Sequence, residues 1–161
     1  MATARQPRFI TPEEYLESQR TAEVRSEYIS GEVYEMSAAS KQHGEIIVNV
    51  GAELRSGLRS GTCQAGSAIA VRTQAAYLIP DLVVYCDGGD FTDQREVLNN
   101  PVVIFEVLSP STADFDHGHK WMLYQQIPSL MHYVLISQAK PHVEVYSRDD
   151  DEWRNHGESE R

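Results

Sequence analysis

Two carboxylates, each beside an apolar run, are the residues of this chain whose types and positions best fit chemistry. Asp81 follows Pro80 in LIPDLVVYC, and Glu106 lies inside VVIFEVLSPST. Proline cannot donate to a sheet, so Pro80 predicts a strand start or kink at Asp81, where a plain turn aspartate is the alternative. A glutamate inside a doubly covered strand requires a cation, because an unpaired buried carboxylate costs several kcal/mol. That cation is either a metal or a basic side chain, for which Arg72 is a candidate.

A helix face just after the glutamate strand carries a second set of functional groups. In STADFDHGHKWMLY, the residues Asp116, Lys120 and Tyr124 are spaced i, i+4 and i+8, so they line one face of a predicted helix. The ordinary alternative is an exposed Asp-Lys pair worth about 0.3–0.5 kcal/mol. The helix begins only a few residues after the strand, however, and its first turns are therefore expected to lean over Glu106.

A histidine at the start of an earlier helix is a further candidate. Ser40 caps this helix, and His43 lies one turn before Ile47 on its apolar stripe, so it is expected to face inward. It would act there as a metal ligand or proton acceptor, although a packed core histidine is the alternative. Glu45 lies on the polar side of the same helix and is expected to be exposed.

The elements that position these residues follow from periodicity, caps and turns. Thr11, Pro12 and Glu14 predict a helix start with a capping box. The predicted elements are this helix to about Gln19, a hairpin in SEYISGEVYEM, a helix from Ser40 to about Arg59, weak strands over 62–65 and 68–72, strong strands over 77–85 and 102–108, a polar loop in DGGDFTDQREVLNN, a helix over about 113–126, and a strand pair in MHYVLI and HVEVYS.

This order predicts an α/β fold of the mixed α+β kind, with a central mixed sheet flanked by helices and preceded by a helix and a hairpin. No linker or repeat divides the chain, so residues 1–161 are expected to form one domain. Its core spans about 10–147, and 148–161 read as a charged tail in which only Trp153 is apolar. No glycine-rich phosphate loop is present.

The bulk composition restricts the partners. With 24 acidic and 14 basic residues the net charge is −10, which disfavours a broad nucleic-acid surface and requires a local site. No apolar run is long enough to span a membrane, and the start lacks a signal-peptide core, so a cytoplasmic location without membrane contact is expected. Cys63 and Cys86 lie in separate predicted strands and are expected to be buried free thiols in a reducing compartment.

A catalytic triad of Ser111, His117 and Asp114 is a competing pattern. All three are close in sequence, but no nucleophile elbow or oxyanion loop accompanies them. Helix capping accounts for Ser111 and Asp114 more simply, so the triad is disfavoured.

These motifs together resemble a known family. The spacing from Pro80-Asp81 to Glu106-Val107-Leu108 resembles the PD-(D/E)XK, restriction-endonuclease-like superfamily. A wider set resembles one of its branches, a group of endonucleases much expanded in some bacteria, over roughly residues 10 to 147. The matching segments are Tyr28 to Val33, Met36-Ser37, His43, Pro80 to Val84, Glu106 to Thr112, Asp116, Lys120, Tyr124 and Tyr133 to Leu135.

The resemblance implies a Mg²⁺-dependent endonuclease that hydrolyses DNA, with Mn²⁺ as a possible substitute and a homodimer as the expected assembly. The metal ligands would be Asp81, Glu106 and the backbone carbonyl of Val107. The usual lysine is replaced by Leu108, and Lys120 would take its place, with His43 and Asp116 in support. Family members commonly add a strand or helix after the EVY strand, which the charged tail is expected to lack.

Two other functions remain open at this point. The chain could keep the fold and the acidic cluster but bind nucleic acid or protein without cutting, which Leu108 and the net charge favour. It could also be a protein-binding dimer that uses an exposed hairpin from Tyr28 to Tyr34. Metal binding distinguishes the nuclease from both.

Overall fold

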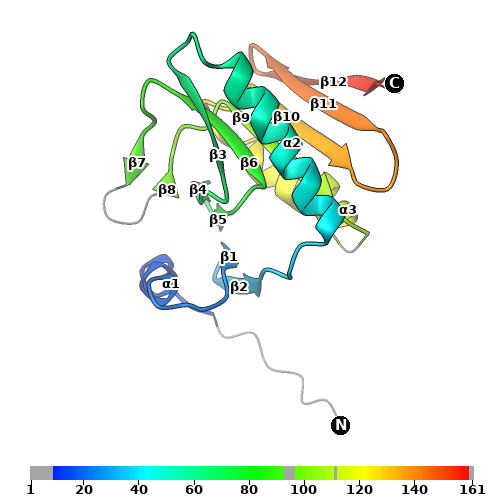
Figure 1. The fold of residues 1–161 in the computed structure, drawn as a ribbon. Helices are drawn as coiled ribbons and strands as arrows, with labels where there is room; N and C mark the ends of the chain where they lie inside the picture. Colours follow the sequence, from blue (N-terminus) through cyan, green and yellow to red (C-terminus); the bar gives the residue numbers. More distant parts are fainter. Residues whose placement is uncertain (1–8, 93–96, 111, 160–161) are drawn as a thin grey trace.

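The computed structural model describes residues 9–92, 97–110 and 112–159. Two six-stranded sheets and several helices form the fold (Figure 1). The elements in chain order are α1 (Pro12–Gln19), β1 (Ser26–Ile29), β2 (Glu32–Glu35), α2 (Lys41–Gly57), β3 (Cys63–Ser67), β4 (Val71–Arg72), β5 (Ala76–Leu78), β6 (Leu82–Cys86), β7 (Phe91–Thr92), β8 (Val97–Leu98), β9 (Val103–Leu108), α3 (Ala113–Phe115), the π-helix η2 (Asp116–Lys120), α4 (Trp121–Tyr124), β10 (His132–Ser137), β11 (Val143–Asp149) and β12 (Glu152–Ser159).

The first sheet has the strand order β2-β1-β5-β4-β8-β7 and contains the N-terminal hairpin. The predicted capping box is present at α1, where Thr11 and Glu14 exchange backbone and side-chain hydrogen bonds. The hairpin turns at Ser30 and Gly31, both with positive φ, which glycine adopts at little cost. All four residues of β1 are buried. The prediction of an exposed hairpin from Tyr28 onward is therefore wrong for β1, because α1 and β5 cover this strand.

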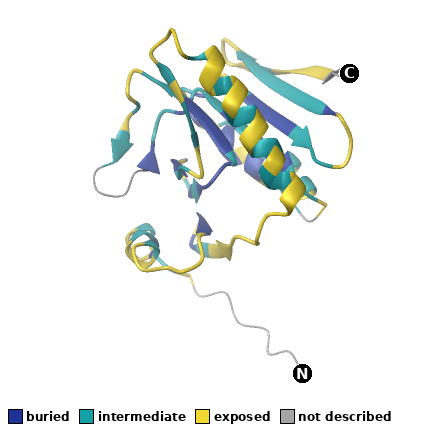
Figure 2. Cartoon of the chain, viewed as in Figure 1, coloured by how far each residue is buried: buried dark blue, intermediate teal, exposed yellow. Residues whose placement is uncertain are grey.

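The second sheet has the order β12-β11-β10-β9-β6-β3, and β9 and β10 are its parallel pair. The helix α2 crosses one face of this sheet (Figure 1), where Gly51 approaches Leu82. The segment from α3 to α4 packs on the other face, where Tyr124 joins the core with Ile104 and Leu135. The central strands are the most buried part of the sheet (Figure 2). The predicted mixed α/β fold is confirmed, with a second sheet in addition.

The predicted strand over 77–85 is broken into β5 and β6, which belong to different sheets. The break falls at Ile79, Pro80 and Asp81, since Pro80 has no N–H to continue a ladder. These three residues connect the first sheet to the second. Asp81 consequently lies where the two sheets meet, directly before β6.

Two segments predicted to be irregular contain strands. The segment predicted as a polar loop contains the short strands β7 and β8, which pair with each other. The predicted charged tail contains β12, which pairs with β11, and its Trp153 packs edge-on against Trp121 at a centroid distance of 4.8 Å. Polar residues suit such an edge strand, whose outer face meets water.

Cys63 and Cys86 form a disulfide rather than remaining free thiols. They stand directly opposite each other in the antiparallel pair of β3 and β6, so strand register alone brings the two sulfur atoms together. Their bond lies at the end of β6 that is remote from Asp81. Among the described residues no helix is long and apolar enough to cross a membrane.

Candidate active site

Asp81 is held between the first turn of α2 and the strand β9. Its Oδ1 lies 2.9 Å from Nε2 of His43, and its Oδ2 accepts a 2.6 Å hydrogen bond from the N–H of Val107. Ser40 caps α2 through the N–H of His43, which fixes the start of the helix and the direction of the imidazole. His43 faces inward as predicted, and the side chains of His43 and Asp81 are 14% and 15% exposed.

The backbone of Val107 faces Asp81 because the pairing between β6 and β9 stops just before it. The last paired residues in that direction are Leu82 and Phe105. In a β-strand the N–H and the C=O of one residue point toward the same edge of the strand, because directly paired residues of antiparallel strands exchange two N–H···O=C hydrogen bonds. The carbonyl of Val107 therefore points toward the same edge as the N–H that binds Asp81.

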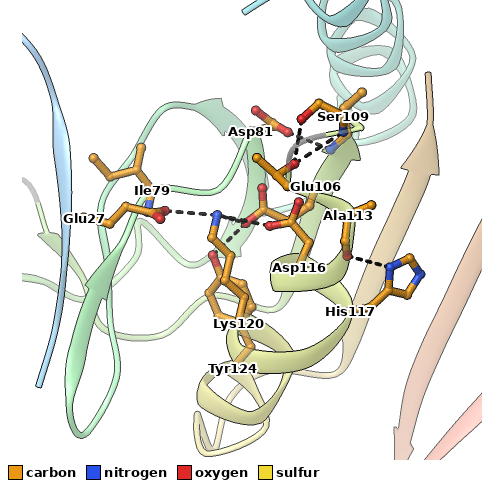
Figure 3. Close-up of polar contacts among 12 residues, drawn as sticks. Glu27, Ile79, Asp81, Glu106, Ser109, Ala113, Asp116, His117, Lys120 and Tyr124 are labelled. Carbon is orange, nitrogen blue, oxygen red and sulfur yellow. Dashed lines mark hydrogen bonds and ion pairs between the residues drawn. The ribbon is translucent and has the colours of Figure 1, made fainter. Parts of the chain in front are cut away.

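Glu106 is buried and finds its cation in Lys120. The Nζ of Lys120 lies 3.1 Å from Oε1 of Glu106, and the hydroxyl of Tyr124 donates to the same oxygen at 3.0 Å. Arg72, the alternative partner, is exposed on β4. Figure 3 shows Lys120 and Tyr124 rising from the helical segment toward Glu106.

A π-helical turn aligns the residues of this helix face. The predicted helix over 113–126 consists of α3, η2 and α4, and the π-turn spans Asp116 to Lys120. A π-helix has more residues per turn than an α-helix, so the side chains of residues i and i+4 point in more nearly the same direction. Such turns are frequent at functional sites. Asp116 and Lys120 are both buried, and their Oδ1 and Nζ are 3.5 Å apart. The exposed Asp-Lys pair considered above is therefore excluded.

Glu27 is a site residue that the sequence reasoning missed. It comes from β1 in the first sheet, and its Oε1 lies 3.1 Å from Nζ of Lys120. The same oxygen accepts a 2.8 Å hydrogen bond from the N–H of Ile79. The signal that identifies Glu106, a charge within an apolar run, is absent at Glu27, whose short strand begins with Ser26 and whose burial is seen only in the structure.

The electrostatics of the cluster are dominated by an excess of carboxylates. Lys120 contacts Glu27, Glu106 and Asp116, which gives three buried carboxylates for one ammonium. Burial raises the pKa of Glu106 to about 8, although Lys120 opposes that rise. Burial likewise raises the pKa of Asp116. Burial also disfavours the charge of Lys120, yet the carboxylates around it raise its pKa well above the usual range.

Comparison with known proteins identifies the family of the chain. Residues 12–160 match a family described as "Uma2: Putative restriction endonuclease". The chain belongs to the Uma2 family. Two uncharacterized proteins of Synechocystis sp. (strain ATCC 27184 / PCC 6803 / Kazusa) are each 33% identical to it: slr1290 over 88% of this chain and 76% of its own length, and sll1609 over 91% and 85%.

A solved structure shares the fold of this Uma2 chain. It is the crystal structure of a putative nuclease belonging to DUF820 from Anabaena variabilis ATCC 29413, with a TM-score of 0.70. The alignment covers 87% of this chain and 82% of that one at 18% sequence identity, so the likeness is one of fold. The family match links the chain to restriction endonucleases, whereas the solved structure shows a shared fold.

The donor atoms expected from the sequence are all oxygens, which a hard divalent cation prefers. In the described part of the chain, no three His, Cys, Asp or Glu side chains gather in a metal-binding arrangement. The expected donors are Asp81, Glu106 and the backbone carbonyl of Val107. Both hydrogen bonds to Glu106 end on Oε1, which leaves Oε2 outside them. Mg²⁺ is commonly bound through only one or two carboxylates and keeps several waters, so an all-oxygen set with few side chains suits it.

The other residues considered in the sequence analysis do not belong to this site. The triad needs Ser111, which lies outside the described residues, and His117 faces the carbonyl of Ala113 and the carboxylate of Glu144 rather than a nucleophile. Glu45 is exposed as predicted and pairs with Lys41 on the helix surface.

Proposed function

We propose that this Uma2 protein is a metal-dependent endonuclease that hydrolyses DNA phosphodiester bonds with Mg²⁺, or with Mn²⁺ in its place. The observation that carries the proposal is the buried excess of negative charge. Glu27, Glu106 and Asp116 surround a single lysine, and Asp81 binds the N–H of the residue that follows Glu106. Such an excess is unfavourable in the protein interior unless protons or a cation neutralise it.

Each residue has a distinct task in this proposal. Asp81, Glu106 and the carbonyl of Val107 would hold the metal, which when bound polarises a phosphate and lowers the pKa of a water. Lys120 would stabilise the negative charge that develops on the scissile phosphate. Lys120 reaches the position from the helix, which compensates for Leu108 at the usual lysine site.

His43 and Asp116 have supporting roles. His43 contacts Oδ1 of Asp81 through Nε2 and lies at the partly accessible side of the site, where it would accept a proton from the attacking water. Asp116 contacts the ammonium of Lys120 from the same helix and orients it. The acidic surface makes weak, metal-assisted DNA binding the expected mode. The homodimer and the cytoplasmic location stay predictions.

The test combines cleavage with metal binding. Asp81→Asn and Glu106→Gln are measured beside Glu45→Gln, an exposed glutamate on α2 that serves as the matched control. Calorimetry with Mn²⁺ should detect binding to the parent protein and the control but not to the two site variants. Plasmid cleavage with Mg²⁺ should follow the same pattern. Full cleavage by either site variant would overturn the assignment of the site.

A second function is favoured by the position of Lys120. Its ammonium is surrounded by three carboxylates and Leu108 replaces the usual lysine, an arrangement that also suits a nuclease fold that binds without cutting. This alternative predicts nucleic-acid or protein binding in the absence of any metal-dependent cleavage. Mn²⁺ binding together with turnover of DNA favours the nuclease, and binding of DNA without turnover favours the alternative.

A further inference from the structure

We propose that Glu27 is a positioning residue of this site, which holds the ammonium of Lys120 from the first sheet and ties it to the segment before Asp81. The inference rests on the proposed nuclease function and adds a residue from outside the predicted motifs. It assigns the N-terminal hairpin a part in the site rather than a surface role.

The geometry joins three elements through one oxygen. Oε1 of Glu27 lies 2.8 Å from the N–H of Ile79 and 3.1 Å from Nζ of Lys120 (Figure 3). Ile79 precedes Pro80 and Asp81, so the carboxylate is fixed to the connection that carries Asp81 from one sheet to the other. Glu27 and Lys120 have side chains that are each 8% exposed. A charged contact so well shielded from water is much stronger than one at the surface.

Glu27 can position Lys120 because it contacts the ammonium from a different sheet than Glu106 does. Glu106 and Asp116 attract Lys120 from the second sheet and from its own helix, and Glu27 attracts it from the first sheet. Without Glu27 the ammonium would be drawn toward Glu106, a proposed metal ligand. With Glu27 the charge of Lys120 is shared between the two sides. A packing role alone would not require a carboxylate, since an amide also accepts the N–H of Ile79.

The decisive variant is therefore Glu27→Gln, which retains an acceptor for Ile79 and removes the charge. Glu27→Asp is the conservative variant, and Glu35→Gln on the neighbouring strand β2 is the matched control because Glu35 is exposed. We expect Glu27→Gln to lower kcat by about tenfold or more, as small misplacements of catalytic groups do. KM should stay within about twofold, and Glu27→Asp should recover part of kcat.

A second measurement reports on Lys120 without any turnover. The chain has only three lysines, and the other two, Lys41 and Lys140, are exposed. Lysine labelled with ¹⁵N and ¹³C therefore gives three side-chain signals in NMR spectra, two of which act as internal references. In Glu27→Gln the Nζ signal of Lys120 should shift and its ammonium protons should exchange faster with water, because a shielded contact of 3.1 Å is lost. The signals of Lys41 and Lys140 should not change.

The outcomes separate this inference from the nuclease proposal. An unchanged Lys120 signal and an unchanged kcat in folded Glu27→Gln would overturn it. A parent protein that binds Mn²⁺ but never cleaves DNA would overturn the nuclease function, while the Lys120 signal would still decide whether Glu27 holds the ammonium. Should Glu27→Gln not fold, the comparison of Glu27→Asp with the parent protein decides it, since shortening the side chain by one methylene should already shift the Lys120 signal.

Discussion

Replacing Glu106 with glutamine should stabilise the metal-free protein while abolishing its proposed metal site. Glu106 is almost fully buried, and burial raises its pKa from 4.5 to about 8. Glutamine has nearly the same shape and still accepts hydrogen bonds from Lys120 and Tyr124 through its amide oxygen. The substitution therefore removes the ionisation and keeps the packing.

The sign and size follow from proton linkage. Between pH 4.5 and about pH 8 the unfolded chain has an ionised Glu106, whereas burial keeps Glu106 protonated in the folded, metal-free protein. In that state the proton neutralises part of the buried negative excess, and Oε1 still accepts hydrogen bonds from Lys120 and Tyr124. The folded state thus binds one more proton than the unfolded chain. The stabilisation from this proton is fully present below pH 4.5 and is lost as the pH rises toward about 8. Each pH unit in this window costs about 1.4 kcal/mol. The free energy of unfolding should accordingly fall by roughly 3–4 kcal/mol between about pH 5 and about pH 8.

The assay is urea unfolding in the presence of EDTA across this pH range. The difference between the parent protein and Glu106→Gln reports the ionisation of Glu106 together with its coupling to Lys120 and Asp116, because titrating residues far from the cluster affect both proteins alike. Glu45→Gln, exposed on α2, should follow the parent protein at every pH. Excess Mn²⁺ should stabilise the parent protein by about 3 kcal/mol at a hundredfold excess over Kd and leave Glu106→Gln unaffected. Equal pH slopes for Glu106→Gln and the parent protein would refute the reasoning.

Three further changes test other parts of the structure. Tyr124→Phe removes a hydroxyl that donates to buried Glu106, which is protonated below about pH 8, so at neutral pH it should lower the free energy of unfolding by about 0.5–1.5 kcal/mol in urea titrations. Cys63→Ser with Cys86→Ser should cost about 3 kcal/mol by the same measurement and leave Mn²⁺ affinity unchanged, because the S–S bond lies at the end of β6 that is remote from Asp81. Trp153→Ala should cost about 2 kcal/mol and thereby show that β12 is part of the folded domain, whereas a free tail would show no loss.

Much of the site could be predicted because its residues obey simple periodicities. The i, i+4, i+8 spacing gave the face of Asp116, Lys120 and Tyr124, and the stripe of α2 gave the inward direction of His43. The π-turn that improves this alignment leaves no mark in apolar periodicity and was not predicted. Glu106 was recognised because a charge within an apolar run is conspicuous.

Other features depend on strand register, which the sequence encodes weakly. Cys63 and Cys86 became partners only because β3 and β6 pair in one register, and a shift by one residue would separate them. The strands β7 and β8 are two residues each, too short to show alternation. The strand β12 has the sequence of a charged tail, because an edge strand tolerates polar residues on its open side.

The position of the site at the junction of the two sheets explains why Glu27 escaped prediction and why it matters. Asp81 and Glu106 belong to the second sheet or its entrance, whereas Glu27 belongs to the first, so no local pattern links them. Pro80 forces the break that separates the sheets, and Glu27 binds the N–H just before that break. The same short connection therefore fixes the carboxylate that orients Lys120 and the carboxylate proposed to bind the metal. Because both are set by one piece of backbone, a shift of the hairpin would displace the lysine and Asp81 together.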